Sequence, residues 1–209
     1  MAAITVSRQY GSGGSAIAKA IAERLKWELI DNEFIDLVAQ RAGLSHEEVE
    51  QREERGPSLV ERLAQALAVS TPELLVAPGE PPATGPPSEA DLVKITEAVI
   101  HEVVQHGHVV LVGRGASAYL GKSERTLHVF VVAPHGLRVQ RVAERLGLSA
   151  KEAERTLDRF DEGRRQYART YYGRRWDDPS QYHLIVNTEF FSYDEAAELV
   201  VETARHRGW

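Results

Sequence analysis

Five short apolar runs alternate with amphipathic stretches along most of the chain. Each run is rich in Val, Ile and Leu and contains few charges, which is typical of strands buried on both faces of a parallel sheet. The predicted strands are 4–6, 27–30, 109–112, 126–132 and 184–186. Their order along the chain, with helical patterns between them, predicts an α/β fold.

The stretches between the runs carry apolar residues at helical spacing. Ile17, Ile21 and Leu25 lie four residues apart and predict a helix after the first run. Further helices are predicted for 92–106, ending at Gly107, for 137–146, for 150–172 and after Ser192. Two of them begin with capping-box sequences, at Ser149 and Ser192. Helices that alternate with strands in this way cover both faces of a parallel sheet.

The segment between the second and third runs has a different composition. It begins with helical patterns near 32–43, after a capping box at 45–48 and around Leu59, Leu63 and Leu67. Residues 71–87 then hold six of the nine prolines. We interpret 71–87 as a flexible loop and not as a linker between domains, because too little sequence precedes it to build a separate core.

Composition narrows the classes of protein that need to be considered. A chain of 209 residues with 43% hydrophobic and 27% charged residues is long enough for one sizeable core. The net charge of −6 argues weakly against nonspecific binding to nucleic acid. The chain has no cysteine, which excludes disulfides and zinc–thiolate sites. No signal peptide and no apolar run of about 20 residues is evident, so we expect a cytoplasmic protein that makes no membrane contact.

A glycine-rich turn joins the first predicted strand to the first predicted helix. Gly11, Gly13 and Gly14 allow backbone N–H groups to close around phosphate oxygens, and the helix N-terminus adds its positive dipole end. The P-loop signature G-x-x-x-x-G-K-[ST] is nevertheless altered, with Arg8 at its first glycine and Gly14 at its lysine. Ser15 keeps the hydroxyl that meets Mg²⁺. The turn therefore predicts a nucleotide site that lacks the usual lysine.

Other polar residues follow predicted strands, where ligands bind in doubly wound sheets. Asp31 ends the second strand, and Arg114 follows the third between two glycines. Asp31 could hold a Mg²⁺-bound water, accept a proton or bind a sugar, or it could only cap the next helix. Arg114 suits a phosphate, and a structural salt bridge is the alternative.

Positive charge is concentrated late in the chain. Residues 138–175 hold ten arginines and one lysine against six acids, a local charge of +5. Most of these arginines could line a solvated helix face, and a subset could converge on a triphosphate when a lid closes. Asp161 and Arg164 are three residues apart and share a helix face. The nearby tyrosines suit packing within a lid better than stacking on a base.

The order of these features resembles the cytidylate kinase-like family among the nucleoside monophosphate kinases. The matching segments are 7–14, 113–115, 161–167, 172–176 and 182–188. They are spread over nearly the whole chain, and the segment Ser-Arg-Gln-Tyr leading into glycines carries the most specific part of the resemblance.

The resemblance implies a P-loop kinase fold with a core at 1–30, 92–147 and 180–209, a helical monophosphate-binding lobe at 31–91 and an arginine-rich lid at 148–179. It implies ATP and Mg²⁺ as cofactors and CMP or dCMP as the acceptor. Asp31 and Ser15 would hold the metal, and Arg114 the acceptor phosphate. Asp161 and Arg164 match a lid pattern. The residues implied to bind the donor nucleotide are Gly11, Ser12, Gly13, Gly14, Ser15, Arg141, Asn187 and Thr188.

Three departures from the pattern of authentic cytidylate kinases leave the acceptor and the activity open. Gly14 replaces a lysine, Gly115 replaces the aspartate of a Gly-Arg-Asp motif, and residues 31–34 follow the second strand in place of a helix that bears tyrosine and arginine and binds the monophosphate. We expect Arg8 or a lid arginine to supply the lost positive charge. The alternatives to a CMP kinase are a nucleotide-binding regulatory protein with little turnover and a kinase for another small acceptor. The partner is expected to be a small molecule and not a nucleic-acid polymer, and the sequence leaves the oligomeric state open.

Overall fold

A computed structural model of the chain describes residues 2–31, 89–113 and 115–209. The chain falls into two units, one formed by Met1–Asp31 and Val103–Trp209 and the other by Asn32–Glu102. The monophosphate-binding lobe, the proline-rich loop and Arg114 therefore lie wholly or mostly outside the described residues. Among those residues no helix has the length and apolar character needed to cross a membrane.

Five parallel strands form the sheet of the first unit. They are β1 (Ala3–Arg8), β2 (Glu28–Asp31), β3 (Val109–Val112), β4 (Thr126–Val132) and β5 (Leu184–Asn187). Their order across the sheet is β2-β3-β1-β4-β5. Ala3 of β1 is in register with Val109 of β3 and with Thr126 of β4. The central β1 strand therefore delivers the residues that follow Arg8 to the middle of the sheet's carboxyl edge.

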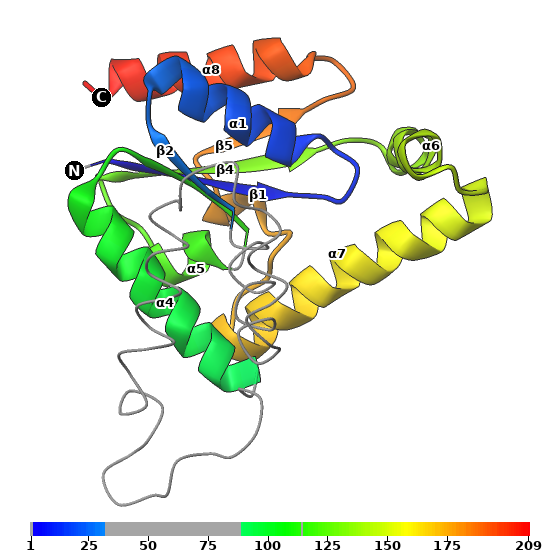
Figure 1. Cartoon of the computed structure of the whole chain (residues 1–209), viewed down its shortest axis with the longest axis horizontal. Coiled ribbons are helices and arrows are strands. Elements are labelled where there is room, and N and C mark those ends of the chain that lie inside the picture. The colour runs from blue at the N-terminus through cyan, green and yellow to red at the C-terminus, as the bar shows by residue number, and fades with distance from the viewer. Residues whose placement is uncertain (1, 32–88, 114) are drawn as a thin grey trace, which may run out of the picture. The chain divides into compact units, whose positions relative to one another are not determined.

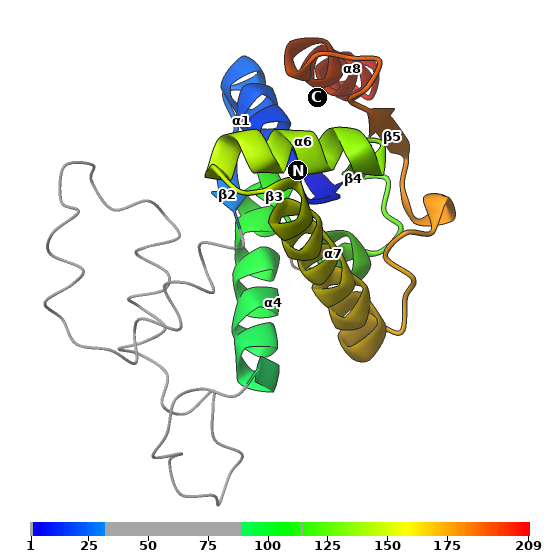
Figure 2. The same cartoon turned by 90° about the vertical axis from the view of Figure 1, so that its right-hand side faces the viewer.

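The helices described are α1 (Gly14–Leu25), α4 (Glu89–His106), α5 (Ala116–Leu120), α6 (His135–Leu146), α7 (Ala150–Tyr172) and α8 (Tyr193–His206). A short 3₁₀ helix spans Pro179–Gln181. Figure 1 shows α1 and α8 lying along the same face of the sheet. Figure 2 shows α7 crossing below α6 beyond the end of the sheet. The long α7 helix therefore lies beyond the sheet and leads the chain back towards β5.

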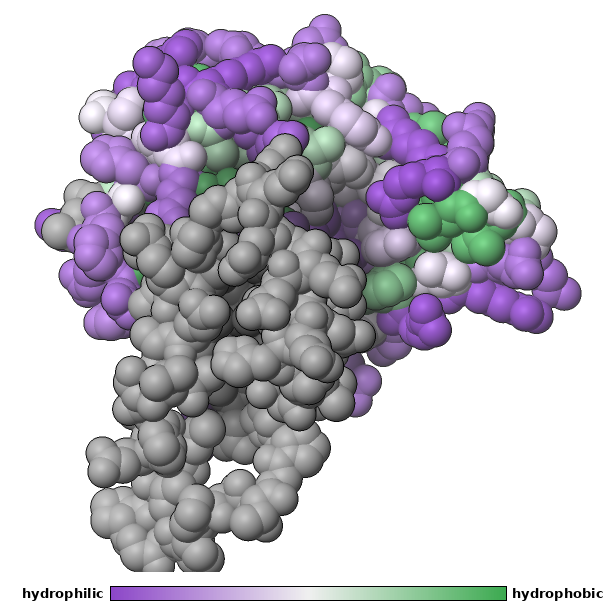
Figure 3. Space-filling model, in the orientation of Figure 1, coloured by the Kyte–Doolittle hydropathy of each residue, from purple (hydrophilic) through white to green (hydrophobic). Residues whose placement is uncertain are grey.

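The core lies between the sheet and the α1–α8 layer. Alternate residues of β1 and β4, such as Val6 and Val129, are buried on this face, where they pack with Ile17 of α1 and Val200 of α8. Burial of such side chains contributes about 1.5–3 kcal/mol each relative to exposure. The opposite face of β4 carries His128 and Phe130. Figure 3 shows mostly hydrophilic side chains along the outer side of the α1–α8 layer.

The predicted fold class is confirmed, and the predicted strands and helices within the described residues are present. The strand 126–132 and the end of α6 at Leu146 have the predicted bounds. The α5 helix was not predicted, because it has only five residues between Gly115 and Gly121 and presents no apolar period.

Candidate functional site: the loop between β1 and α1

The glycine-rich turn is a closed loop that is held by its own backbone and by β4. Gly11 and Gly13 have φ angles of 79° and 87°, which L-residues rarely adopt. The Ser12 hydroxyl lies within donating distance of the carbonyl oxygens of Gln9 (2.8 Å) and Val131 (3.1 Å). Gln9 Oε1 in turn accepts a hydrogen bond from the Ala133 N–H at 3.1 Å. The loop is thus fixed in shape by short contacts to the adjacent strand.

The N-terminus of α1 differs from those of α7 and α8. Gly13 is its N-cap and has no side chain that could cap the first-turn N–H groups. The α7 and α8 helices instead carry complete capping boxes, from Ser149 with Glu152 and from Ser192 with Glu195. Uncapped first-turn N–H groups and the positive end of a helix dipole are the groups that bind phosphate.

Asp161 of α7 joins the loop to the α6 and α7 helices. Its carboxylate accepts hydrogen bonds from the Tyr10 backbone N–H (2.8 Å), from Arg138 Nη1 (2.7 Å) and from Arg164 Nη1 (3.3 Å). Asp161 is fully buried, and the Arg138 side chain is nearly so. We call Asp161, Arg138 and Arg164 the loop clamp.

The two arginines of the loop clamp also bind the loop backbone. Arg138 donates to the carbonyl oxygens of Tyr10 (3.1 Å) and Ala133 (3.0 Å), and Arg164 donates to that of Arg8 (3.1 Å). The Tyr10 ring stacks on Phe160 at 4.5 Å, and Arg145 lies 5.3 Å from the same ring. Phosphate-loop geometry in this protein therefore depends on two helices that follow it by more than 120 residues.

A second group of contacts ties the other side of the loop to the turn after β5. The Thr188 hydroxyl donates to the Ser12 carbonyl oxygen at 2.9 Å and accepts from Arg141 Nη1 at 2.8 Å. Arg141 also donates to the Thr188 carbonyl oxygen, and its guanidinium lies 5.5 Å from the ring centroid of Tyr193. The same ring lies against Gly13, where any Cβ would collide with it.

The Arg8 side chain lies beside the backbone at the carboxyl ends of β1, β3 and β2. Arg8 is 5% exposed, and its Nη2 lies 4.0 Å from Asp31 Oδ1. A Cβ at Gly14 or Gly113 would collide with Arg8. A Cβ at Gly115 would collide in the same way with the ring of Tyr172. Both glycines that replace motif residues, Gly14 and Gly115, therefore abut a side chain from elsewhere in the chain.

Tyr182 can be assigned a protonation state. Burial raises the pKa of Tyr182 to about 12, and its hydroxyl donates to the Trp176 carbonyl oxygen at 2.6 Å. The phenol is therefore neutral at pH 7 and cannot act as a general base there. Ser7 and Ser117, whose hydroxyls lie 3.4 Å apart, are the other hydroxyls near it.

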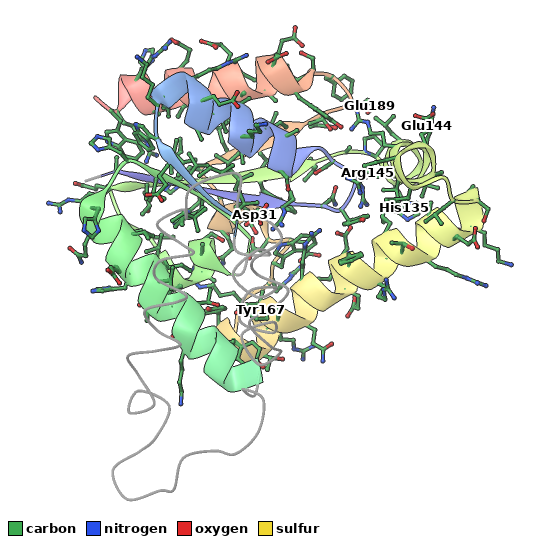
Figure 4. The ribbon with its side chains drawn as sticks, viewed as in Figure 1. Asp31, His135, Glu144, Arg145, Tyr167 and Glu189 are labelled. Atoms are coloured by element: carbon green, nitrogen blue, oxygen red, sulfur yellow. The ribbon has the colours of Figure 1, made fainter. Side chains whose placement is uncertain are left out.

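The predicted site residues are brought together to different degrees. Arg8, Asp31, Asp161 and Arg164 lie around one edge of the loop, and Arg141 and Thr188 around the other. Ser15 is exposed in the first turn of α1. The Asn187 side chain caps its own turn by accepting from the Glu189 N–H at 3.0 Å. Figure 4 shows Asp31 at the end of β2, Tyr167 on α7 and Arg145 on α6. Arg114 lies outside the described residues.

Sequence reasoning missed several residues that shape the loop. Tyr193 and Tyr172 pack on glycines, and nothing in the sequence signals a contact between residues so far apart. Arg138 was one of ten arginines without a feature to distinguish it. Within the described residues no group of three or more His, Cys, Asp or Glu side chains could hold a metal ion.

Comparison with protein families supports the assignment made from the loop. The family model described as cytidylate kinase-like family matches residues 3–190. The chain belongs to the cytidylate kinase-like family. Among its relatives, the cytidylate kinase of Pyrococcus horikoshii is 29% identical over 204 residues, which cover 97% of this chain and 88% of that one.

Two other relatives match this chain over only part of their length. The cytidylate kinase of Aeropyrum pernix is 34% identical over 108 residues, which are 51% of this chain and 62% of the relative. A uronate isomerase of Corynebacterium glutamicum is 35% identical over 104 residues, which are half of this chain and 20% of the isomerase. These two matches thus span less than two thirds of each relative.

Two solved structures have folds similar to that of this chain. An uncharacterized protein from Eubacterium ventriosum has a TM-score of 0.68 at 20% identity, with 97% of this chain and 98% of that one covered. Shikimate kinase from Acinetobacter baumannii has a TM-score of 0.50 at 14% identity, with 99% and 94% covered. The chain therefore has a P-loop kinase fold.

Proposed function

We propose that this protein transfers a phosphoryl group from ATP, with Mg²⁺, to a nucleoside monophosphate, with CMP or dCMP as the acceptor. Membership of the cytidylate kinase-like family supports a nucleotide kinase. The observation that carries the proposal is the loop between β1 and α1, with left-handed glycines and a helix N-terminus that no side chain of its N-cap covers.

The loop fits the phosphates of ATP. A Cβ at Gly11 would lie 3.0 Å from the Arg138 carbonyl oxygen, and one at Gly13 would collide with the Tyr193 ring. The backbone thus runs where no side chain could stand between it and its neighbours, and the N–H groups that would bind a phosphate would be fixed in place before it arrives. Preorganised N–H groups of this kind stabilise charge that develops on phosphoryl oxygens without reorganising during the reaction.

Mg²⁺ would be held by Ser15 and Asp31, together with phosphate oxygens and water. Bound there, the metal would supply positive charge that offsets the negative charge of the phosphates. Ser15 is exposed in the first turn of α1, and the Asp31 side chain is about one third exposed. Asp31 also lies at the end of β2, the edge where doubly wound sheets bind ligands, so it could instead orient the acceptor.

The loop clamp is assigned a positioning role. Asp161 and Arg138 bind each other and the backbone of Tyr10, and Arg138 also binds the carbonyl oxygen of Ala133. Arg164 is partly exposed beside the same backbone and could reach a phosphate by a change of rotamer. Arg141 and Thr188, at the opposite side of the loop, are proposed to shape the donor-nucleotide site, with Asn187 at the end of β5 next to them.

A coupled ADP-release assay tests the proposal. It would compare CMP, dCMP, UMP, AMP and GMP with a reaction that lacks an acceptor, each with ATP and Mg²⁺. We expect ADP release that depends on CMP or dCMP. Thermal unfolding with and without ATP would be followed in parallel, since a ligand that binds the native state raises Tm.

Two other outcomes would replace the proposal. If ATP raises Tm and no acceptor stimulates ADP release, the protein is a nucleotide-binding regulator or a kinase for an acceptor outside the panel. If ATP neither raises Tm nor is consumed, nucleotide binding itself is wrong.

An active-site variant makes the assay specific for this site. Asp31→Asn is expected to lower kcat by at least about 100-fold, the lower end of what a positioned acid–base group contributes. Asp158→Asn on the exposed face of α7 is the matched control and should leave kcat unchanged. Equal activity of both variants would remove Asp31 from the mechanism.

A further inference from the structure

The glycine at position 14 has a steric cause. A Cβ at Gly14 would collide with Arg8 Cβ and would lie 2.9 Å from Arg8 Cγ. The third neighbour, Val131 Cβ, would be at an ordinary 3.5 Å. Gly14 does not have a left-handed φ angle. The backbone conformation therefore permits any residue at position 14, and the Arg8 side chain alone excludes a lysine there.

The far end of Arg8 meets a second glycine. A Cβ at Gly113 would collide with Arg8 Nη1 and would lie 3.1 Å from Cζ. Gly113 is the residue after β3, and Asp31 Oδ1, 4.0 Å from Arg8 Nη2, is at the end of β2. The Arg8 side chain therefore starts at the end of β1, passes Gly14 at the beginning of α1, and carries its guanidinium across the end of β3 towards β2.

This course places a permanent positive charge at the carboxyl ends of three neighbouring strands, beside the phosphate loop. A guanidinium stays protonated at any physiological pH and presents five N–H donors in a fixed plane. Because Arg8 is buried, its charge is screened less than that of a surface lysine and acts more strongly on a neighbouring anion.

We propose that Arg8 supplies the positive charge on the donor phosphates that the lysine of other P-loops supplies, and that Arg8 and a lysine at position 14 exclude each other. Gly14 is a glycine because the Arg8 side chain occupies the space of its Cβ atom, and Gly113 has in addition a φ of 82°, which by itself favours glycine. The inference rests on the proposed function only in taking a polyphosphate as the ligand of the loop.

The steric half of the proposal is tested by thermal unfolding, without any ligand. Gly14→Ala should lower Tm, and the same change in an Arg8→Gly background should not lower it further. Gly163→Ala is the matched control, because Gly163 is also helical and a Cβ there meets nothing within 4 Å. That variant should keep or raise Tm. A Gly14→Ala protein as stable as Gly163→Ala would overturn the steric exclusion.

The electrostatic half is tested by calorimetric titration with inorganic triphosphate and Mg²⁺. Arg8→Gln should weaken binding by roughly 10- to 100-fold, the loss that corresponds to one charge-assisted hydrogen-bonding group. The relocated charge in Arg8→Gly/Gly14→Lys should restore binding to within about 10-fold of the wild type. Arg24→Gln, at the other end of α1, is the control and should bind as the wild type does.

Each outcome separates this inference from the proposed function. If the wild type phosphorylates CMP and Arg8→Gln binds triphosphate as tightly as the wild type, the inference fails and the function stands. If Arg8→Gln loses triphosphate binding and no acceptor is phosphorylated, the inference stands and the function fails. Failure of the wild type to bind triphosphate overturns the inference. If Arg8→Gln does not fold, Arg8→Met, which also removes the charge, replaces it in the titration, and affinity equal to that of the wild type would again overturn the inference.

Discussion

Two ionic clusters lie near the opposite ends of α1, and they differ in the property that sets their energy. The loop clamp before α1 is buried, with side chains of Asp161, Arg138 and Arg164 that are 3%, 6% and 16% exposed. The cluster at the end of α1 joins Arg24 to Asp194 and Glu198 of α8, and these side chains are 31%, 85% and 51% exposed. We call the second group the α1–α8 cluster.

The two clusters have similar distances and different surroundings. Arg24 lies 2.7 Å from Asp194, and Arg138 lies 2.7 Å from Asp161. In water-exposed pairs the attraction is offset by hydration and side-chain entropy. In a buried cluster, removal of one partner leaves the others desolvated without compensation. Distance alone therefore does not indicate which ion pairs stabilise this protein, and the burial of their side chains does.

The largest expected effect is that of Asp161→Ala. It leaves the Arg138 charge and the Tyr10 N–H without their acceptor, so we expect a loss of about 3–5 kcal/mol in the free energy of unfolding. Urea unfolding followed by circular dichroism measures it. Asp158→Ala, on the exposed face of the same helix, is the control. A loss below about 1 kcal/mol, the range of surface pairs, would show that the two clusters are alike.

A pH titration extends the comparison to His128, a buried side chain whose charged form is disfavoured by burial. Burial lowers the pKa of His128 from its ordinary value of 6.5, and its Nε2 donates to the Gly121 carbonyl oxygen at 2.7 Å. The unfolded chain therefore takes up a proton at a higher pH than the folded one. Stability should fall as the pH falls below about 6.5, because the unfolded state then binds more protons.

The variant His128→Gln should flatten this slope between pH 7 and 5, whereas His206→Gln at the exposed end of α8 should not. Chemical unfolding at several pH values measures both. Burial also lowers the pKa of His183, which stacks on His128 at 5.0 Å, so part of the slope should remain. A wild-type protein equally stable at pH 7 and 5 would contradict the prediction.

A smaller effect is expected at the capped helix N-terminus beside the α1–α8 cluster. Ser192 accepts from the Glu195 N–H at 3.2 Å, and its hydroxyl lowers the pKa of the Glu195 carboxyl group. Ser192→Ala should cost about 1 kcal/mol of stability, as loss of an N-cap does, and should return the pKa of Glu195 towards its ordinary value. Differential scanning calorimetry and carboxyl NMR chemical shifts measure the two effects, and Ser180→Ala in the short 3₁₀ helix is the control.

The smallest expected effect is that of Arg24→Ala. Removal of its two exposed ion pairs should change the free energy of unfolding by less than about 1 kcal/mol, and the difference should shrink further in 0.5 M salt as screening grows. Urea unfolding at low and high salt measures it. A loss that is larger and independent of salt would mean that the α1–α8 cluster behaves as a buried one.

Most of the fold could be predicted from local patterns. The apolar run 126–132 and the capping boxes at Ser149 and Ser192 define β4, α7 and α8, because a strand or helix is set by residues adjacent in sequence. The α5 helix could not be predicted, since five residues between two glycines contain too little periodicity. The loop was predicted as a phosphate site because its glycines are contiguous with a strand and a helix.

The sequence by itself determined the order of strands and helices, the glycine loop and the concentration of arginines in residues 138–175. The tertiary structure alone decided which arginines hold the loop, and why Gly14 replaces a motif residue. Arg8 and Gly113 are separated by 105 positions, and Gly115 and Tyr172 by 57. A local pattern cannot encode which of two distant side chains fills a shared space, because that choice is made when the strands align and the core packs.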